Sequence, residues 1–535
     1  MSFRADRRLI FELFIFQFFR FLKYLKWPYS GLQNRSSQKM NPAKKQKLAP
    51  SRPEDDIPFQ LGPYDIDFNF AQSYHDSKDP VSWNESLIKQ KKDIRNFDDS
   101  RITPDQIAIR TALLSSDRHT LITGEAGTGK TFLQLSLIKE LKKANANVFR
   151  IGPTHGSIAN LIDDSLTYQT FFAMPPTIDY LIPQDRKTHI KDMASACLRQ
   201  PFIQKANHRV NEKSTLIIEE AAMISAEIID LILKAVEKAA PNRIRIFFFF
   251  DILQLVPVTG KLLIESENVQ TMPTLILREN IRQAGDDDFL DLLRAVAKGD
   301  MDGVHYLMLK SRVLPNTNPP PHRRLCARNI TVDEHNLRHL QSLHTSTYTS
   351  RSLDTALRRM PDYTTAKFPQ TVSFAIGAKI VFESSPLHEI GLHNGVTGTI
   401  IDLIRTGSDI VLPVVYVDKY KEAIIVHPIL EDIHSIVHGS TAPAVIATRL
   451  QFPFSIAEAT TIHKAQGQTI TSSVEVDLKH MNSPGQVYTA LSRLTNLADL
   501  TIKNLPPMQY GGSIEPVRPS KVAIHWCKRV GLFVK

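Results

Sequence analysis

Cysteine is scarce in this sequence. Only three of the 535 residues are cysteine, Cys197, Cys326 and Cys527, and no two of them form a CxxC pair. Structural zinc sites and disulfide frameworks need closely spaced or paired cysteines. The sequence therefore argues against both kinds of site and predicts free thiols in a reducing compartment.

Long apolar runs are also absent. The most apolar stretch, residues 9–25, is rich in Phe, Ile and Leu but is interrupted by Glu12, Gln17, Arg20 and Lys23. It falls short of the roughly 20 clean apolar residues that a membrane-spanning helix needs, so we expect no stable membrane insertion. Three explanations stay open for this stretch: an organellar presequence, a spurious extension upstream of Met40, or membrane association.

No single block gathers the basic residues, although the chain carries a net charge of +10. This excess indicates a polyanionic partner and favours nucleic acid. Just after Met40, the tract PAKKQKLAP (42–50) is similar to a short basic nuclear localisation signal, and a solvated basic tail is the alternative. We therefore expect a nuclear protein, with the mitochondrion as a second location if residues 1–39 are a presequence.

The chain shows no internal repeats, and its 42% hydrophobic content excludes disorder for the bulk of it. Short apolar runs alternate with helical segments, and the runs at 119–123, 147–152, 214–218 and 243–250 are predicted strands. Strands separated by helices predict an α/β fold with a doubly wound parallel sheet. The run Phe247–Phe250 is continuously apolar, which is typical of a strand covered on both faces.

One Gly-rich segment carries the strongest chemical signal. GEAGTGKT (124–131) follows a predicted strand and precedes a predicted helix at 132–143, which is the setting of a phosphate-binding P-loop. Its backbone N–H groups and the helix N-terminus favour phosphate, Lys130 would neutralise the outer phosphates of ATP, and the Thr131 hydroxyl would bind Mg²⁺. The predicted nucleotide contacts are Gly124, Glu125, Ala126, Gly127, Thr128, Gly129, Lys130 and Thr131.

A second acidic site completes such a loop. The apolar strand in STLIIEEAAM (214–223) runs directly into Glu219 and Glu220. In this arrangement the first acid orients hydrated Mg²⁺ and the second activates the attacking water as general base. We assign these roles to Glu219 and Glu220, respectively.

With these motifs the sequence resembles the Pif (petite integration frequency) family of DNA helicases, a superfamily-one class related to the bacterial RecD motor. The resemblance spans about 102–502 and rests on segments in the family's order: ITPDQIAIRTAL (102–113), PTHGSIAN (153–160), TYQTFF (167–172), FDILQLVPV (250–258), LRENIRQ (277–283), ATTIHKAQGQT (459–469) and GQVYTALSR (485–493).

The resemblance implies roles for individual residues. Gln106 would recognise adenine, Gln254 would sense the γ-phosphate, and Arg282 would contact phosphate. Arg493 would be an arginine finger, reaching Lys130 across a cleft from the second domain together with Arg282. DNA contacts would come from Thr154, His463 and Lys464, with Gln466 near the nucleotide.

The resemblance also implies an architecture of two RecA-like domains with a small SH3-like β insertion in the second. The expected boundaries are 1–100 for a mostly disordered extension and linker, 101–262 for the first domain, 263–385 with 453–510 for the second, 386–452 for the insertion, and 511–535 for a C-terminal tail.

Two positions depart from the family pattern. Glu219 stands where the family carries Asp, and Phe250 stands where it carries Gly. Magnesium tolerates little geometric error, so these changes put the rate of catalysis in question more than the fold.

The resulting prediction is a monomeric ATP- and Mg²⁺-dependent helicase that moves 5′ to 3′ on single-stranded DNA and unwinds duplex or structured DNA in genome maintenance. The alternatives are a degenerate clamp that binds ATP and DNA without unwinding, and an unrelated P-loop enzyme such as a small-molecule kinase. The protein partners are left open.

Overall fold

The computed structural model describes residues 94–154, 166–172, 214–239, 244–313, 323–356, 368–383, 396–405, 411–418, 420–436, 443–509 and 514–533. All of these belong to one compact unit, Ser86–Lys535. The apolar stretch 9–25, the basic tract 42–50 and most of the predicted extension lie outside the described residues.

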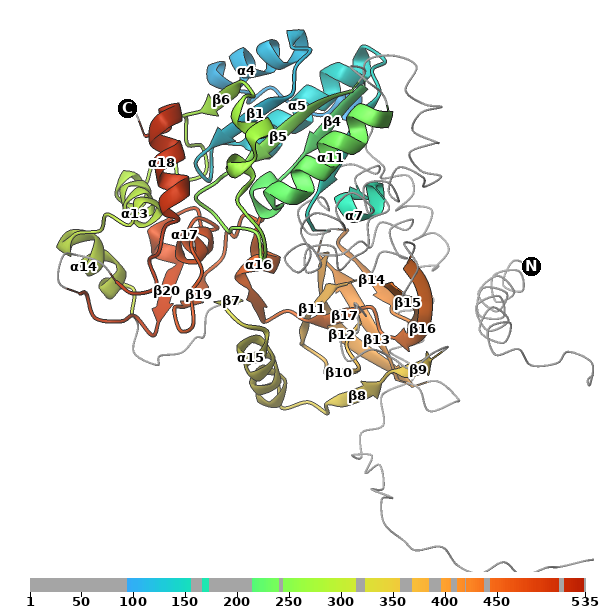
Figure 1. Cartoon of the computed structure of the whole chain (residues 1–535). Coiled ribbons are helices and arrows are strands. Elements are labelled where there is room, and N and C mark those ends of the chain that lie inside the picture. The colour runs from blue at the N-terminus through green and yellow to red at the C-terminus, as the bar shows by residue number, and fades with distance from the viewer. Residues whose placement is uncertain are drawn as a thin grey trace, which may run out of the picture. The chain divides into compact units, whose positions relative to one another are not determined.

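A six-stranded parallel sheet forms the first part of the fold (Figure 1). Its order is β3-β2-β4-β5-β1-β6. The strands are β1 (Thr120–Gly124), β2 (Val148–Gly152), β3 (Leu166–Thr167), β4 (Ser214–Ile218), β5 (Ile244–Phe250) and β6 (Thr274–Leu277). The four strands expected from the sequence are therefore confirmed to within a residue or two.

Helices cover both faces of this sheet. Successive strand residues point to opposite faces, so Phe247 and Phe249 pack with α4 (Pro104–Ser115) and α5 (Lys130–Lys143), whereas Phe248 and Phe250 pack with α11 (Ala226–Ala239). All four rings are fully buried. This double coverage explains the unbroken apolar run and confirms that it is a core strand.

A second parallel sheet has the order β18-β7-β19-β20. Its strands come from distant parts of the chain: β7 (Arg323–Cys326), β18 (Ala459–Thr461), β19 (Val474–Asp477) and β20 (Leu500–Lys503). The helices that accompany it are α13 (Asp287–Lys298), α14 (Gly303–Ser311), α15 (Asn329–Ser342), α16 (Ile462–Ala465) and α17 (Gln486–Leu491). The predicted α/β class with two parallel sheets is thus confirmed.

Antiparallel strands fill the interval between β7 and β18. They form a five-stranded sheet of order β14-β13-β12-β11-β17, a three-stranded sheet β15-β16-β9 and the pair β10-β8. Their bounds are β8 (Tyr348–Arg351), β9 (Leu353–Ala356), β10 (Thr371–Phe374), β11 (Lys379–Phe382), β12 (Thr397–Arg405), β13 (Val411–Val417), β14 (Glu422–Ile425), β15 (Ile429–Ile436), β16 (Pro443–Gln451) and β17 (Phe454–Ile456).

The remaining elements are short connectors. They are η2 (Ile94–Asn96), α7 (Tyr168–Phe171), η3 (Ala221–Met223), η4 (Leu263–Glu265), α12 (Glu267–Gln270) and η6 (Leu497–Asp499). None of the described helices is both long and apolar enough to cross a membrane.

Strand pairing moves two of the expected boundaries. β6 extends the first sheet beyond residue 262, because it pairs with β1 along its whole length. The antiparallel region begins at β8 rather than at residue 386, and it takes in β11, which the expected boundaries assign to the second domain. Each of these strands is only four residues long. The domain to which such a strand belongs depends on the strand with which it pairs, and the sequence alone does not identify that strand.

The expected C-terminal tail contains a docked helix, α18 (Lys521–Val530). Ser520 caps its start by accepting a hydrogen bond from the Ala523 N–H, and Gly531 ends it in the left-handed conformation (φ 75°). Trp526 is buried, and its ring lies 5.6 Å from the ring of Phe250 between centroids. The phenylalanine that replaces the family glycine therefore has a packing partner near the end of the chain.

Replacing Trp526 by Ala should undock α18. Removing a buried tryptophan side chain destabilises the docked state by about 3–5 kcal/mol, and the other contacts of a short helix do not offset that loss. Hydrogen–deuterium exchange of residues 521–530 should therefore become much faster. Val522→Ala is the matched control, because Val522 is 47% exposed on the same helix. Equal exchange in the two variants would contradict the proposed anchoring by Trp526.

Candidate nucleotide site and its link to the second sheet

The P-loop joins the end of β1 to the start of α5, as the sequence predicted. Gly127 and Gly129 adopt positive φ angles of 90° and 76°. A Cβ at Gly127 would lie 2.6 Å from the Gln283 Oε1, and one at Gly129 would lie 2.4 Å from the Gln106 Nε2. Both the backbone conformation and the close packing therefore require glycine here.

Lys130 lies at the first position of α5. Its Nζ donates hydrogen bonds to the carbonyl oxygens of Gly124 (2.9 Å) and Glu125 (3.0 Å). Burial lowers the pKa of Lys130, while Asp251 and Glu220 oppose that shift. The ammonium group is thus held against the loop that would receive the phosphates.

Thr131 and Glu219 meet at the expected metal position. The Thr131 hydroxyl donates to the Glu219 Oε1 over 2.8 Å, and Glu219 is 4% exposed. No cluster of three or more His, Cys, Asp or Glu side chains occurs among the described residues. Mg²⁺ needs few protein ligands when phosphates supply the rest, so these two oxygen donors fit that cation.

Glu220, the predicted general base, has a strained backbone. Its φ of 49° lies in the left-handed region, which is uncommon for a residue with a side chain. The Glu220 Oε2 accepts a hydrogen bond of 3.0 Å from the Nε2 of Gln466, which follows α16. A residue of the second sheet's layer therefore reaches the acid that would activate water.

Gln254 and Arg493 are in direct contact. The Arg493 Nη2 donates to the Gln254 Oε1 over 2.9 Å, and the Gln254 Nε2 donates to the Asp251 Oδ2 over 2.9 Å. Arg493 is 2% exposed, and burial lowers its pKa while Glu220 raises it. The predicted sensor and the predicted arginine finger thus form one connected pair.

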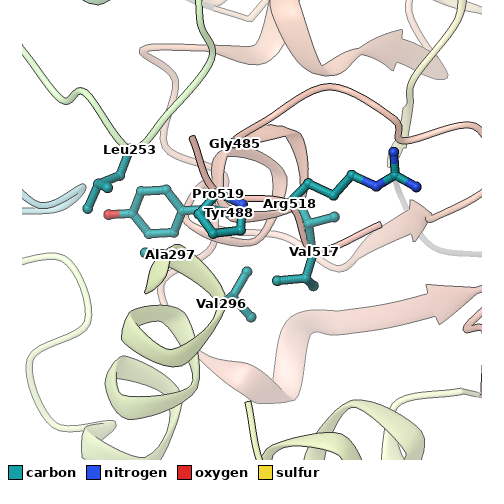
Figure 2. A pocket seen from close by; sticks show the side chains of 9 residues that line it. Leu253, Val296, Ala297, Gly485, Tyr488, Val517, Arg518 and Pro519 are labelled. Carbon is teal, nitrogen blue, oxygen red and sulfur yellow. The ribbon is translucent and has the colours of Figure 1, made fainter. Parts of the chain in front are cut away.

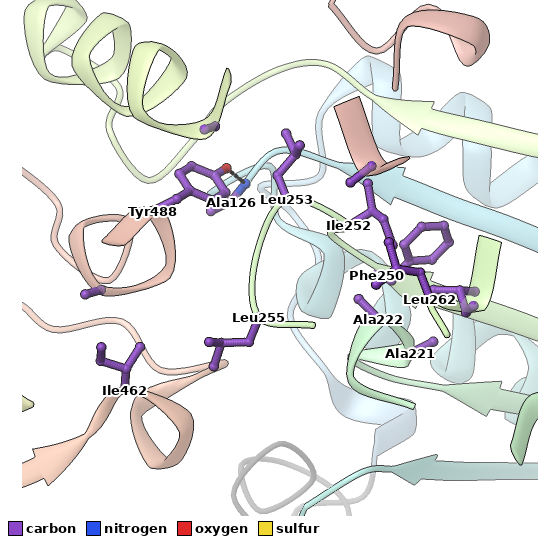
Figure 3. Packing of buried hydrophobic residues seen from close by; sticks show 14 of the residues in the cluster. Ala126, Ala221, Ala222, Phe250, Ile252, Leu253, Leu255, Leu262, Ile462 and Tyr488 are labelled. Atoms are coloured by element: carbon purple, nitrogen blue, oxygen red, sulfur yellow. Dashed lines mark hydrogen bonds between the residues drawn. The ribbon is translucent and has the colours of Figure 1, made fainter. Parts of the chain in front are cut away.

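Tyr488 closes this network. Its hydroxyl accepts a hydrogen bond from the Ala126 N–H over 2.9 Å (Figure 3). The same hydroxyl donates to the Asp251 Oδ2 over 3.3 Å. Burial raises the pKa of Tyr488 well above its usual value, so it stays protonated at neutral pH. One hydroxyl on α17 therefore links the P-loop to the residue that holds Gln254.

Gly485 allows α17 to approach the loop after β5. A Cβ there would lie 2.1 Å from the carbonyl oxygen of Gln254, and its φ is 76°. A small pocket beside this contact is drawn in Figure 2. It is lined by Leu253, Val296, Ala297, Gly485, Val487, Tyr488, Val517, Arg518 and Pro519.

The placement of Arg282 in the second domain was wrong. Arg282 follows β6 of the first sheet, and its backbone N–H donates to the carbonyl oxygen of Gly127 over 3.1 Å. Its Nη1 donates to the carbonyl oxygen of Ser492 over 2.7 Å. Burial lowers the pKa of Arg282 to about 9, so it is still charged at neutral pH. The boundary error at residue 262 explains the misplacement.

Gln106 lies beside the P-loop. It is the third residue of α4, where it forms a reciprocal capping box with Thr103. Its Nε2 donates to the carbonyl oxygen of Thr128 over 3.2 Å. The structure therefore brings Gln106 to the nucleotide site, and its contact with adenine stays a prediction.

The three predicted DNA-binding residues all lie within the described part of the chain. Thr154 is half-buried just after β2. Burial lowers the pKa of His463, which is therefore neutral at pH 7, and exposed Lys464 pairs with Glu383 over 2.5 Å. Their contacts with DNA stay predictions, and residues 155–160 of the same segment lie outside the described residues.

Our interpretation of the sequence gave no role to three polar residues of this site, Asp251, Tyr488 and Arg150. Asp251 and Tyr488 belong to the family-like segments FDILQLVPV and GQVYTALSR, but the two residues that bond to each other are 237 positions apart in the sequence. Arg150 forms a buried ion pair with Glu219 from within β2. The sequence signal that could have indicated Arg150 is a single arginine within an apolar strand.

Comparison with known proteins shows what the chain resembles as a whole. A family model described as an AAA domain matches residues 101–316. The ATP-dependent DNA helicase Pif1 of Bdellovibrio bacteriovorus is 26% identical over 412 residues, which cover 75% of this chain and 87% of that protein. The chain is thus similar to a Pif helicase over three quarters of its length. Helicase PIF1 of Xenopus laevis is 24% identical to this chain, over 76% of the chain and 62% of the relative.

Solved Pif structures share the fold. The crystal structure of Pif1 helicase from Candida albicans superposes with a TM-score of 0.66 and 23% identity, covering 80% of this chain and 99% of that one. A Bacteroides Pif1 bound to single-stranded DNA has a TM-score of 0.63 and 19% identity, covering 80% and 96%. At these identities the likeness concerns the fold.

Replacing Tyr488 by Phe should slow nucleotide hydrolysis about tenfold, with little change in nucleotide affinity. The substitution leaves the Ala126 N–H and Asp251 without their shared hydroxyl, a loss of roughly 1–3 kcal/mol. The loss destabilises the arrangement in which α17 contacts the P-loop. Steady-state measurements of kcat and KM separate the effect on turnover from the effect on nucleotide affinity.

Tyr306→Phe provides the control, because the Tyr306 hydroxyl also donates to a carbonyl oxygen, that of Pro506 at 3.3 Å, away from the P-loop. Its kcat should stay within about twofold of wild type, as expected for one neutral hydrogen bond outside the site. A wild-type kcat for Tyr488→Phe would show that the hydroxyl has no part in turnover.

Proposed function

We propose that this chain is an ATP-dependent DNA helicase that translocates 5′ to 3′ on single-stranded DNA. The observation that carries the proposal is the contact of Arg493 and Tyr488, both from the second sheet's layer, with Gln254 and the P-loop. A P-loop that is completed by another part of the chain couples hydrolysis to relative motion of the two parts.

The residues divide the chemistry among them. Lys130, Arg282 and Arg493 would stabilise the negative charge that develops on the γ-phosphate oxygens in the transition state. Glu220 would accept the proton of the attacking water, with Gln466 orienting its carboxylate. Mg²⁺, when bound by Thr131 and Glu219, would neutralise further phosphate charge.

Coupling follows from the geometry of Gln254. Its amide touches Arg493 on one side and Asp251 on the other. Loss of the γ-phosphate would alter the position of Arg493, and the change would pass through Gln254 and Asp251 to Tyr488 on α17. Hydrolysis would therefore loosen α17 from the first sheet.

DNA is the proposed track. The printed names of the relatives are those of DNA helicases, and one structural neighbour is bound to single-stranded DNA. The net charge of +10 favours a polyanion, and binding through phosphates and stacked bases carries little sequence preference. Because one chain supplies both Lys130 and Arg493, a monomer suffices.

The first experiment is steady-state ATP hydrolysis by the chain from Met40 onward, with and without single-stranded DNA, compared with Lys130→Ala. We expect DNA to stimulate wild-type turnover strongly, and the variant to lose that turnover because the phosphate charge is no longer neutralised. Unwinding of substrates with one blocked end then tests the polarity.

Lys143→Ala is the matched control, since Lys143 is an exposed lysine on the same helix whose only described partner is Glu140, three residues away. A surface pair of this kind contributes little, so its turnover should equal wild type. Folded wild-type protein that binds ATP and DNA without turnover above Lys130→Ala would replace the helicase proposal with a non-hydrolysing clamp.

We also propose that the protein acts in the nucleus, on the basis of the basic tract at 42–50, with the mitochondrion as a second site. A fluorescent reporter fused after residue 100 should accumulate in nuclei, and neutralising Lys44, Lys45 and Lys47 should disperse it. A reporter carrying residues 1–40 that stays diffuse in the cytosol would remove the mitochondrial alternative.

A further inference from the structure

Arg150 is a buried cation next to the proposed metal site. It lies within β2, opposite Ile217 of β4, and is 3% exposed. Its Nη2 forms an ion pair with the Glu219 Oε2. None of the motifs that support the proposed function assigns a role to this arginine, although a buried charge is costly unless it is paired.

The arginine is fixed from two sides. Its Nε donates to the Oε1 of Gln134 over 3.2 Å, and Gln134 lies one turn after Thr131 on α5, fully buried. Burial lowers the pKa of Arg150 to about 10, which leaves the guanidinium charged at neutral pH. The site therefore contains a fixed positive charge next to Glu219.

Glu219 uses both carboxylate oxygens in this arrangement. Oε1 accepts from the Thr131 hydroxyl, and Oε2 is bound by Arg150. The proposed metal ligands are thus already joined to each other, and the charge of the carboxylate is already balanced. A divalent cation that binds here must share Glu219 with the guanidinium.

We propose that Arg150 is a positioning residue of the metal site: it orients and neutralises Glu219 before the cation arrives and thereby weakens the binding of Mg²⁺ with nucleotide. This proposal rests on the proposed function, because it takes Thr131 and Glu219 as the Mg²⁺ ligands. Under this proposal, Arg150 supplies the counter-charge of Glu219 from within the same sheet. Glu219 is the longer acid that stands where the family carries Asp.

Two consequences have definite signs. Without Arg150, the buried carboxylate of Glu219 lacks a counter-charge in metal-free protein, so that form loses stability. The same change removes a repulsive charge from the cation, so Mg²⁺ binds more tightly. A purely structural arginine would lower stability equally with and without the cation.

The test is Arg150→Met. Fluorescent ADP is titrated with Mg²⁺, and thermal unfolding is followed in EDTA and in Mg²⁺ with ADP. We expect the Mg²⁺ midpoint to fall about tenfold, the effect of removing one nearby charge in a shielded site. The melting temperature should fall in EDTA, and the gain from Mg²⁺ with ADP should exceed that of wild type.

Arg245→Met is the matched control. Arg245 is a half-buried arginine of β5, which β4 separates from β2 in the same sheet; its Nε donates to the Thr215 hydroxyl over 2.9 Å, remote from Glu219. This variant should lose melting temperature to the same extent in both conditions and keep the wild-type Mg²⁺ midpoint. An unchanged midpoint in Arg150→Met would overturn the proposal.

A double variant keeps the test decisive if Arg150→Met does not fold. Glu219→Gln should raise the Mg²⁺ midpoint, because it removes the acid and leaves Arg150 facing the cation. Arg150→Met combined with Glu219→Gln removes both charges and should lower that midpoint again at least about fivefold. No recovery would contradict the proposal, whereas wild-type protein without Mg²⁺-dependent ADP binding would contradict the proposed function instead.

Discussion

The hydroxyl of Tyr488 is the contact on which the rest of the site depends. It joins the Ala126 N–H of the P-loop to Asp251, which in turn holds the Gln254 amide against Arg493. Each group in this chain is buried, so each would carry a desolvation cost if the chain were broken. The network is therefore either complete or strongly unfavourable, so a movement of α17 away from the P-loop would have to break it as a whole.

Charge balance explains why the same site can tolerate several buried cations. Lys130, Arg282 and Arg493 all have pKa values lowered by burial, and the charge of Arg493 lowers the pKa of Arg282 further. Glu220 and Asp251 supply only part of the opposing charge. An excess of positive charge of this kind suits a polyanionic ligand, because the phosphates of a nucleotide would complete the balance that the side chains leave unfinished.

The predictable parts of this structure were those that depend on local chemistry. A strand, a Gly-rich turn and a helix follow one another between residues 119 and 143, so the P-loop could be located from the sequence. The domain assignment of Arg282 could not, because it depends on whether the four-residue strand β6 pairs with β1 or with the second sheet. Tyr488 belongs to a motif that the sequence shows, but its partner Ala126 lies 362 residues away. Nothing in the local sequence pattern indicates that these two residues are in contact.

The two departures from the family pattern have the same kind of explanation. Phe250 fills a space against Trp526 of α18, and Glu219 carries its negative charge against Arg150 of β2. A site that is losing function accumulates changes without matching partners, and buried ones leave cavities or unbalanced charges. Here each unusual residue is fully accommodated by another that is distant in sequence and adjacent in space. The departures are therefore better understood as the repacking of a motor than as the decay expected of a degenerate clamp.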